Sequence, residues 1–191
     1  IGGNPNLAQI SIPSTWKEVP SGLLKNNQVL KTFEIPDGIE SIGESAFEGS
    51  VIETIAIPDS VASIGDNAFK DCKNITSIVL PKNLTVLGFS AFQGSGISEV
   101  TVPGGVEKLQ PKVFMDCDSL KKVVIEDGVT AIDGFALGYC EILEEVVIPD
   151  SVVNIAAYAF FASNPGDVHL SVSRNSQGEK AAEAILYVYS D

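Results

Sequence analysis

The side chains that could carry out catalysis in this chain are few. Among its 191 residues there is one histidine, His169, and there are three cysteines, Cys72, Cys117 and Cys140. A Ser-His-Asp or Cys-His arrangement would have to use His169, and a zinc site needs His or Cys ligands that converge. The glycines form no phosphate-binding fingerprint. We therefore predict no enzyme, no catalytic residue, no metal site and no cofactor.

Four aspartates lie two residues after an apolar residue that recurs along the chain, and such a column could form a calcium ladder. They are Asp37, Asp59, Asp127 and Asp150. Lys82 and Gly104 interrupt the column, and an aspartate after proline in a turn accepts a local backbone hydrogen bond. We favour this turn role over metal binding. The other acidic residues are scattered, as is usual for solvated positions, and we infer no glycosidase carboxylate pair from them.

The three cysteines share one repeated position. The same column contains Asn27, Ser50, Ser95 and Ser163 in other units. We expect these small side chains to point inward, where a thiol behaves as a small apolar group. Cys117 and Cys140 would lie about 5 Å apart in stacked strands, which permits a disulfide. Because stacked parallel side chains rarely present the required torsion, we favour reduced thiols.

Seven copies of one pattern, spaced by 22 or 23 residues, organise these positions. We call the apolar residue that usually precedes a proline the anchor of each copy. The anchors are Ile12, Ile35, Ile57, Leu80, Val102, Ile125 and Ile148. Apolar residues also lie two and five positions before each anchor and four and seven positions after it, including Trp16 in the first copy. This period is typical of a solenoid whose units bury their apolar sides against one another.

Each copy predicts two extended stretches and one turn. Residues 76–80 exemplify the first stretch, with Ile78 and Leu80 pointing inward, and residues 61–64 exemplify the second. A helical or 3₁₀ turn is expected near residues 67–70. Eleven and twelve positions after the anchor lies a small residue followed by an aromatic one, as in Ala68-Phe69 and Ala91-Phe92. We interpret these aromatic residues as a stacked core column.

The unit resembles the BspA-like, or Treponema-type, subgroup of leucine-rich repeats, which reads approximately C-x-x-L-x-x-I-x-L-P-x-x-V-x-x-I-G-x-x-A-F. The matching residues are Cys72, Ile75, Ile78, Leu80-Pro81, Leu84, Leu87-Gly88 and Ala91-Phe92. The resemblance covers residues 7–163, with local departures at Trp16, Leu23-Leu24, Pro111 and Leu137. We predict a leucine-rich repeat solenoid: a right-handed, β-dominated coil with a parallel concave sheet of short strands and 3₁₀ or helical turns on its convex side.

We expect one domain over residues 1–191. Residues 7–34 form an atypical N-terminal repeat, residues 35–163 form regular repeats, and residues 164–191 form a C-terminal cap. In the cap, alternating residues predict a strand over 168–172. Ser176 and Glu179 form a capping box at the start of a helix, which would present one apolar face. The residues of that face are Ala181, Ala182, Ile185, Leu186 and Tyr189.

Charge limits the class of partner. Twelve basic and twenty-five acidic residues give a formal net charge of −13, which repels nucleic acid and anionic lipid. No apolar run approaches the roughly eighteen residues of a membrane helix. We therefore predict no nucleic-acid partner and no membrane insertion.

The informative surface is the outward side of the anchor strands. One position before the anchor, an apolar stripe is flanked by polar and charged residues three positions before it. The candidate binding residues are Val79, Thr101, Val124, Val147, Ser77, Glu99, Lys122 and Glu145. An apolar stripe with a charged rim is typical of a protein-binding patch. The alternative is strand propensity alone, because Val and Thr are favoured in strands without any ligand.

The resemblance implies a bacterial cell-surface or secreted protein that adheres to host or bacterial proteins, such as extracellular-matrix or bacterial surface proteins. Seven turns at about 4.8 Å give a face roughly 30 Å long, which suits a protein contact. The alternative hypothesis is a structural spacer within a larger surface protein, or a segment that associates weakly with itself through its ends or its Val stripe.

Overall fold

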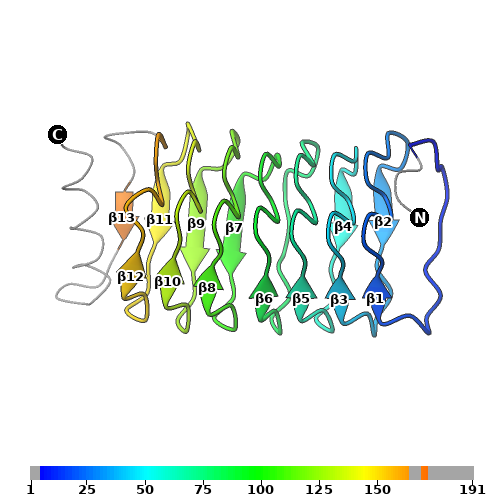
Figure 1. Cartoon of the computed structure of the whole chain (residues 1–191), viewed down its shortest axis with the longest axis horizontal. Helices are drawn as coiled ribbons and strands as arrows, with labels where there is room; N and C mark the ends of the chain where they lie inside the picture. The colour runs from blue at the N-terminus through cyan, green and yellow to red at the C-terminus, as the bar shows by residue number, and fades with distance from the viewer. Residues whose placement is uncertain (1–4, 164–168, 172–191) are drawn as a thin grey trace.

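The backbone winds into a coil whose turns stack along one axis (Figure 1). The computed structural model describes residues 5–163 and 169–171. Every strand pair in this part of the chain is parallel, and paired residues are 22 to 24 positions apart, as with Thr101 and Val124. The predicted parallel solenoid is therefore confirmed.

Two rows of short strands run along the coil, and their arrows point in opposite directions in Figure 1. The first row ends near the anchors and contains β2 (Thr32–Glu34), β4 (Thr54–Ala56), β7 (Glu99–Val102), β9 (Lys122–Ile125), β11 (Glu145–Val147) and β13 (His169–Ser171). The second row contains β1 (Glu18–Val19), β3 (Ser41–Ile42), β5 (Ser63–Ile64), β6 (Val86–Leu87), β8 (Lys108–Leu109), β10 (Ala131–Ile132) and β12 (Asn154–Ile155).

The first row is not the continuous sheet that the sequence predicts. It consists of the pair β2-β4 and the four-stranded sheet β7-β9-β11-β13. Residues 76–80, predicted as a strand, lie between them without strand pairing, so that prediction is wrong. The corner that precedes them, Cys72 to Ile75, is one residue longer than the corners of both neighbouring turns, at Ser50 and Ser95. Within residues 5–147 it is the only such corner flanked by a shorter one on each side. The register itself is kept, because the Ser98 amide donates to the Thr76 carbonyl at 3.1 Å, as the Lys121 amide donates to the Ser98 carbonyl one turn later.

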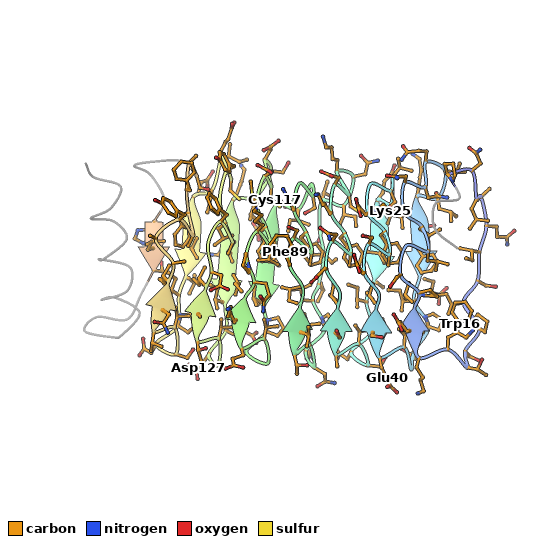
Figure 2. The ribbon with its side chains drawn as sticks, viewed as in Figure 1. Trp16, Lys25, Glu40, Phe89, Cys117 and Asp127 are labelled. Carbon is orange, nitrogen blue, oxygen red and sulfur yellow. The ribbon has the colours of Figure 1, made fainter. Side chains whose placement is uncertain are left out.

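The first turn also departs from the expected pattern. Trp16 was predicted to point inward, but its side chain is 39% exposed and lies at the N-terminal end of the coil (Figure 2). The equivalent residues Ile39, Val61 and Leu84 are buried. Those residues are covered by a turn on each side, whereas a terminal turn is covered on one side only.

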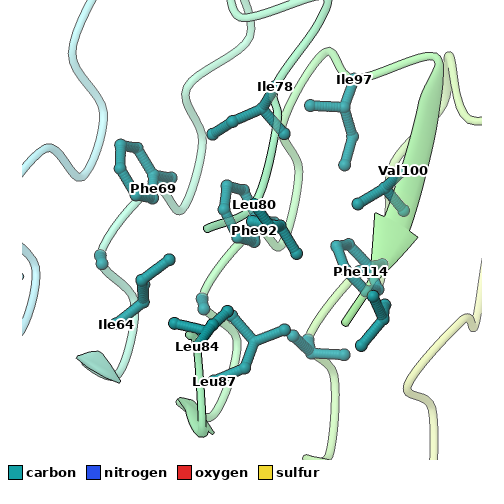
Figure 3. Close-up of a cluster of buried hydrophobic side chains, with 14 of the residues drawn as sticks. Ile64, Phe69, Ile78, Leu80, Leu84, Leu87, Phe92, Ile97, Val100 and Phe114 are labelled. Carbon is teal, nitrogen blue, oxygen red and sulfur yellow. The ribbon is translucent and has the colours of Figure 1, made fainter. Parts of the chain in front are cut away.

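The core is a stack of similar layers, one for each turn of the coil. Ile64, Leu84 and Leu87 surround the aromatic column, in which Phe69 and Phe92 lie in successive turns (Figure 3). The ring centroids of Phe47 and Phe69, and of Phe69 and Phe92, are 5.0 Å apart, and those of Phe92 and Phe114 are 5.8 Å apart. The predicted aromatic core is confirmed, and it continues through Leu137 to Phe160.

The third side of the coil, which we call the turn face, consists of β-turns instead of the expected 3₁₀ or helical turns. In residues 43–50, the amides of Ala46, Glu48 and Ser50 each donate to a carbonyl three residues earlier. The intervening amides donate across to the next turn, as from Phe47 to Ala68 at 2.8 Å. Ser45 and Gly49 have φ values of 53° and 66°. A left-handed residue at every fourth position reverses the backbone before a helix can propagate.

At the C-terminal end, β13 pairs with β11, so a strand lies within the predicted stretch 168–172. The helix predicted from Ser176 onward lies outside the described residues, as do most residues of the predicted cap. Within the described residues, no helix has the length and apolar character needed to span a bilayer.

Candidate functional site

A cleft of about 420 Å³ opens on the first row where the sheet is interrupted. Its walls are residues 77–80 on one side and strands β7 and β9 on the other. Among its lining residues are six of the eight predicted binding residues: Ser77, Val79, Glu99, Thr101, Lys122 and Val124. The structure thus brings these side chains from three successive turns to one concave feature. Glu145 and Val147 lie on β11, outside it.

The interruption also changes the environment of the predicted Val stripe. Thr101 lies opposite Val124, and Val124 lies opposite Val147, in the parallel ladder. Val124 and Val147 are half-buried, whereas Val79 is 80% exposed. No backbone hydrogen bond joins residues 77–80 to β4 or β7 in the part of the chain that the structure describes. Val79 therefore stands away from the ladder instead of packing beside Thr101.

A second cleft, which the sequence analysis missed, lies on the other side of Val79. It has a volume of about 390 Å³ and is bounded by residues 53–57 and 76–79. Val79 and Ser77 line both clefts. An exposed apolar side chain between two grooves offers a partner an anchor point with contact surface on each side. The one sequence feature that sets this turn apart is its corner after Cys72, which is longer than the corners at Ser50 and Ser95.

Alternating charges form the rim of the first cleft. Glu99 lies opposite Lys122, which lies opposite Glu145, and Lys122 Nζ is 2.7 Å from a Glu145 carboxylate oxygen. The hydrogen bond from Lys122 lowers the pKa of Glu145, and the same bond raises the pKa of Lys122. Both side chains are open to solvent, so this pair adds little to stability. The charged residues that line the cleft itself are Lys82, Glu99, Lys122 and Glu126, two basic and two acidic. This balance suits a partner of mixed charge.

In the described residues, the column aspartate Asp59 and the cysteines have structural surroundings. No three His, Cys, Asp or Glu groups lie together so that they could hold a metal ion. Burial raises the pKa of Cys72 to about 12 and that of Cys117 to about 11, and it raises the pKa of Cys140 as well. Neutral thiols are poor nucleophiles. Asp59 of the proposed aspartate column accepts a 3.1 Å hydrogen bond from the backbone amide of Lys82, which is a structural role.

The protein-family model of the BspA type leucine-rich repeat region matches the chain in six copies, over residues 3–121 and 107–184. The chain belongs to the BspA-type leucine-rich repeat family. The family accounts for the repeat spacing, the buried columns and the parallel ladders described above. No curated protein matches the sequence.

Solved leucine-rich repeat proteins have a similar fold. A leucine-rich repeat protein from Bacteroides ovatus is 31% identical, with a TM-score of 0.67 over 74% of this chain and 38% of that one. The T. pallidum leucine-rich repeat protein is 22% identical, with a TM-score of 0.60 over 81% of this chain and 70% of that one. A leucine-rich cell surface protein from Faecalibacterium prausnitzii is 23% identical, with a TM-score of 0.51 over 89% and 61%.

The chain spans less than two fifths of the Bacteroides ovatus protein's length. A BspA-type array of this size is consistent with a protein-interaction module. Fold alone assigns no ligand, because one fold supports many functions.

Proposed function

We propose that this BspA-type array is a non-enzymatic binding module of a bacterial cell-surface or secreted protein, and that it adheres to a host or bacterial protein through the first row. The observation that carries the proposal is Val79, an 80% exposed apolar side chain between two clefts. Exposed apolar groups with a charged rim favour protein contacts. The Faecalibacterium relative, described as a cell surface protein, supports the location.

The binding face is rigid on one side of the cleft, which reduces the entropic cost of association. Strands β7, β9, β11 and β13 form one ladder, so the side chains of Thr101 and Val124 are presented on a preformed surface. We therefore expect the partner to adapt to this ladder and to cover Val79. Extracellular-matrix and bacterial surface proteins are the class of partner that we propose.

The experiment is binding of the whole chain to a panel of extracellular-matrix, plasma and bacterial-surface proteins by surface plasmon resonance. We expect saturable binding to a member of the panel. Val79→Asp should lower the affinity at least about tenfold, because it places a charge at an apolar anchor that the partner would cover. Val86→Asp is the matched control, since Val86 is 52% exposed on second-row strand β6. Equal loss in both variants would contradict the assigned face.

A structural spacer is the competing function. If no member of the panel binds and the wild-type chain remains a monomer in sedimentation velocity, the proposal fails and the spacer hypothesis is favoured. If Val79→Asp dissolves a wild-type dimer instead, the first row is a contact between copies of the chain.

A further inference from the structure

Four aromatic side chains gather on the turn face near the C-terminal end of the described coil. We call them the aromatic platform: Phe135, Tyr139, Tyr158 and Phe161. The ring centroids of the other three lie within 6.4 Å of the ring centroid of Phe135. They point away from the core, whose own aromatic column passes through Phe114 and Phe160. The core therefore does not account for them.

The rings have a defined arrangement. Phe135 is nearly parallel to Tyr139 and to Tyr158, with interplanar angles of 6° and 11°. Phe161 stands at 69° to 72° to all three. The backbone holds this geometry, because the amide of Phe135 donates to Tyr158 and the amide of Tyr139 donates to Phe161, at 2.9 and 2.7 Å. The platform is thus preorganised by the same hydrogen bonds that stack the turns.

The local backbone does not favour aromatic residues at two of these positions. Phe135 and Tyr139 have φ values of 59° and 57°, a left-handed conformation that is uncommon for bulky side chains. Equivalent positions in other turns are occupied by small, polar or flexible side chains. They are Ser45, Asn67, Ser90 and Lys112 in the first column, and Gly49, Asp71, Gly94 and Asp116 in the second. Strained residues of this kind concentrate at functional sites.

The neighbouring glycine makes room for the cluster. Gly138 occupies the position that Phe161 occupies one turn later. A Cβ atom on Gly138 would lie 3.2 Å from Cδ1 of Phe135 and 3.3 Å from its Cβ and Cα atoms. Any larger side chain would therefore crowd Phe135.

The area of the platform favours a small ligand over a protein. Tyr139, Tyr158 and Phe161 are 38%, 54% and 36% exposed. At about 200 Å² for each aromatic side chain, these fractions leave roughly 250 Å² available. A stable protein contact needs about 800 Å² on each partner. A purely apolar small molecule would prefer an enclosed pocket. The two clefts described above lie on the first row and not at the platform, so an apolar small molecule is not the ligand that we favour here.

We propose that the aromatic platform is a carbohydrate-binding site for neutral pyranose glycans. The C–H face of a pyranose ring stacks on an exposed aromatic ring, and the phenol hydroxyls of Tyr139 and Tyr158 can donate to sugar oxygens. Rings contributed by two adjacent turns would hold successive sugar units of one chain. The formal net charge of −13 opposes sulfated or sialylated glycans and favours neutral ones.

The test is affinity electrophoresis of the full chain in gels that contain laminarin, hydroxyethylcellulose, soluble starch, xylan or galactomannan. These probes distinguish β-linked from α-linked polysaccharides, and they distinguish glucans from polysaccharides built of other sugars. We expect retardation by at least one of them, and its loss in Tyr139→Asn/Tyr158→Ser, with a rise of about tenfold or more in Kd for the matching oligosaccharide. Asn suits position 139 because Asn26 occupies the same column in the first turn, and Ser suits position 158 because Ser45 and Ser90 occupy its column. Phe89→Ala is the control, since Phe89 is an exposed aromatic residue elsewhere on the turn face.

Tyr158→Ser alone covers the case in which the double variant fails to fold, because Tyr158 has no left-handed φ value. Val79→Asp should leave retardation unchanged, which separates this site from the protein-binding cleft. Absence of retardation by all five polysaccharides overturns the proposal, as does retardation that the tyrosine substitutions leave intact. A wild-type dimer that these substitutions dissolve, without glycan binding, would assign the platform to self-contact.

Discussion

At the scale of single residues, the cysteine column shows how the repeat controls reactivity. Cys72 Sγ donates to the Phe47 carbonyl at 3.0 Å, and Cys117 Sγ donates to the Phe92 carbonyl at 3.1 Å. Each thiol replaces a serine of the same column and lies completely inside the coil. Burial opposes the thiolate, so these groups retain their protons well above the usual pH of titration.

This proton retention predicts that alkali destabilises the wild-type chain. The thiols titrate near pH 9.0 when unfolded and higher when folded, so their stabilising effect is complete below pH 9.0 and declines above it. Between pH 8 and 10 we expect a loss of about 1 kcal/mol per thiol in the free energy of unfolding. Urea titrations of the wild type and of Cys72→Ser/Cys117→Ser/Cys140→Ser would measure it. Identical pH slopes in the two proteins would contradict the prediction.

Ser90 offers a second test at the residue scale. It is buried, its hydroxyl has no hydrogen-bond partner among the described residues, and its φ value is 52°. An unsatisfied buried hydroxyl costs about 1–3 kcal/mol. We expect Ser90→Ala to raise the free energy of unfolding by about 1 kcal/mol. Ser90→Gly would also relieve the left-handed conformation, partly offset by the greater freedom of the unfolded chain.

The control for Ser90 is Ser95→Ala, in a column five residues further along the same turn. Ser95 is equally buried, but its hydroxyl lies 3.5 Å from Cys117 Sγ. We expect this substitution to lower stability, because it removes a hydrogen-bond partner inside the core. A stability loss in Ser90→Ala of the same size would show that the Ser90 hydroxyl is satisfied after all.

At the scale of elements, the aromatic column ties the turn face to both strand rows. Phe92 stacks between Phe69 and Phe114, and it is completely buried. Leu137 occupies the same column one turn after Phe114 and is buried without loss of the fold. The column therefore needs an apolar group of this approximate volume at each level.

This comparison predicts a graded response to substitution of Phe92. Phe92→Ala should lower the free energy of unfolding by about 3–5 kcal/mol, whereas Phe92→Leu should cost less than about 1.5 kcal/mol. Phe89→Ala is the control, since Phe89 lies at the surface, where the Lys112 Nζ atom is 5.7 Å from the centroid of its ring. It should cost about 1 kcal/mol at most. Urea unfolding measures all three, and equal costs for Ala and Leu at position 92 would refute the stacking argument.

At the scale of the whole molecule, the coil has one region where its sheets are interrupted on two sides. The first row lacks ladder pairing around residues 76–80, and the second row lacks it between β6 and β8. The turn face remains continuous there, because Phe69 donates to Ala91 and Phe92 donates to Val113, at 2.7 and 2.9 Å. The two halves of the solenoid are thus joined by the turn face, by the aromatic column and, at the corner before the first row, by the Ser98 amide, which donates to the Thr76 carbonyl at 3.1 Å.

We expect this region to exchange its amide hydrogens early. Ile78 and Leu80 are buried residues whose backbone amides donate to no acceptor among the described residues, whereas Val123 and Val124 lie in β9 between β7 and β11. Exchange protection follows local hydrogen bonding and opening. Hydrogen exchange read by NMR should give faster rates at residues 78 and 80 than at 123 and 124. Equal protection would show that the ladder is continuous in solution.

The sequence by itself determined the solenoid, its parallel register and its core columns. A short period repeated seven times leaves one way for every copy to bury its apolar residues, and Ile64, Phe69 and Cys72 lie where their spacing predicts. It also assigned outward positions to six residues that line the cleft, from Ser77 to Val124, because outward positions on an extended stretch alternate with inward ones.

Only the tertiary structure decided where this regularity ends. Residues 76–80 keep the inward positions of the other anchor strands, since Ile78 and Leu80 are buried, and yet they form no strand pair. The prominence of Val79 follows from the lost pairing. The aromatic platform combines Phe135 and Tyr139 with Tyr158 and Phe161 from the next turn. Phe135 and Tyr139 adopt left-handed backbone conformations that their residue types disfavour. Both features arise from contacts between turns, and a pattern within one repeat contains no information about them.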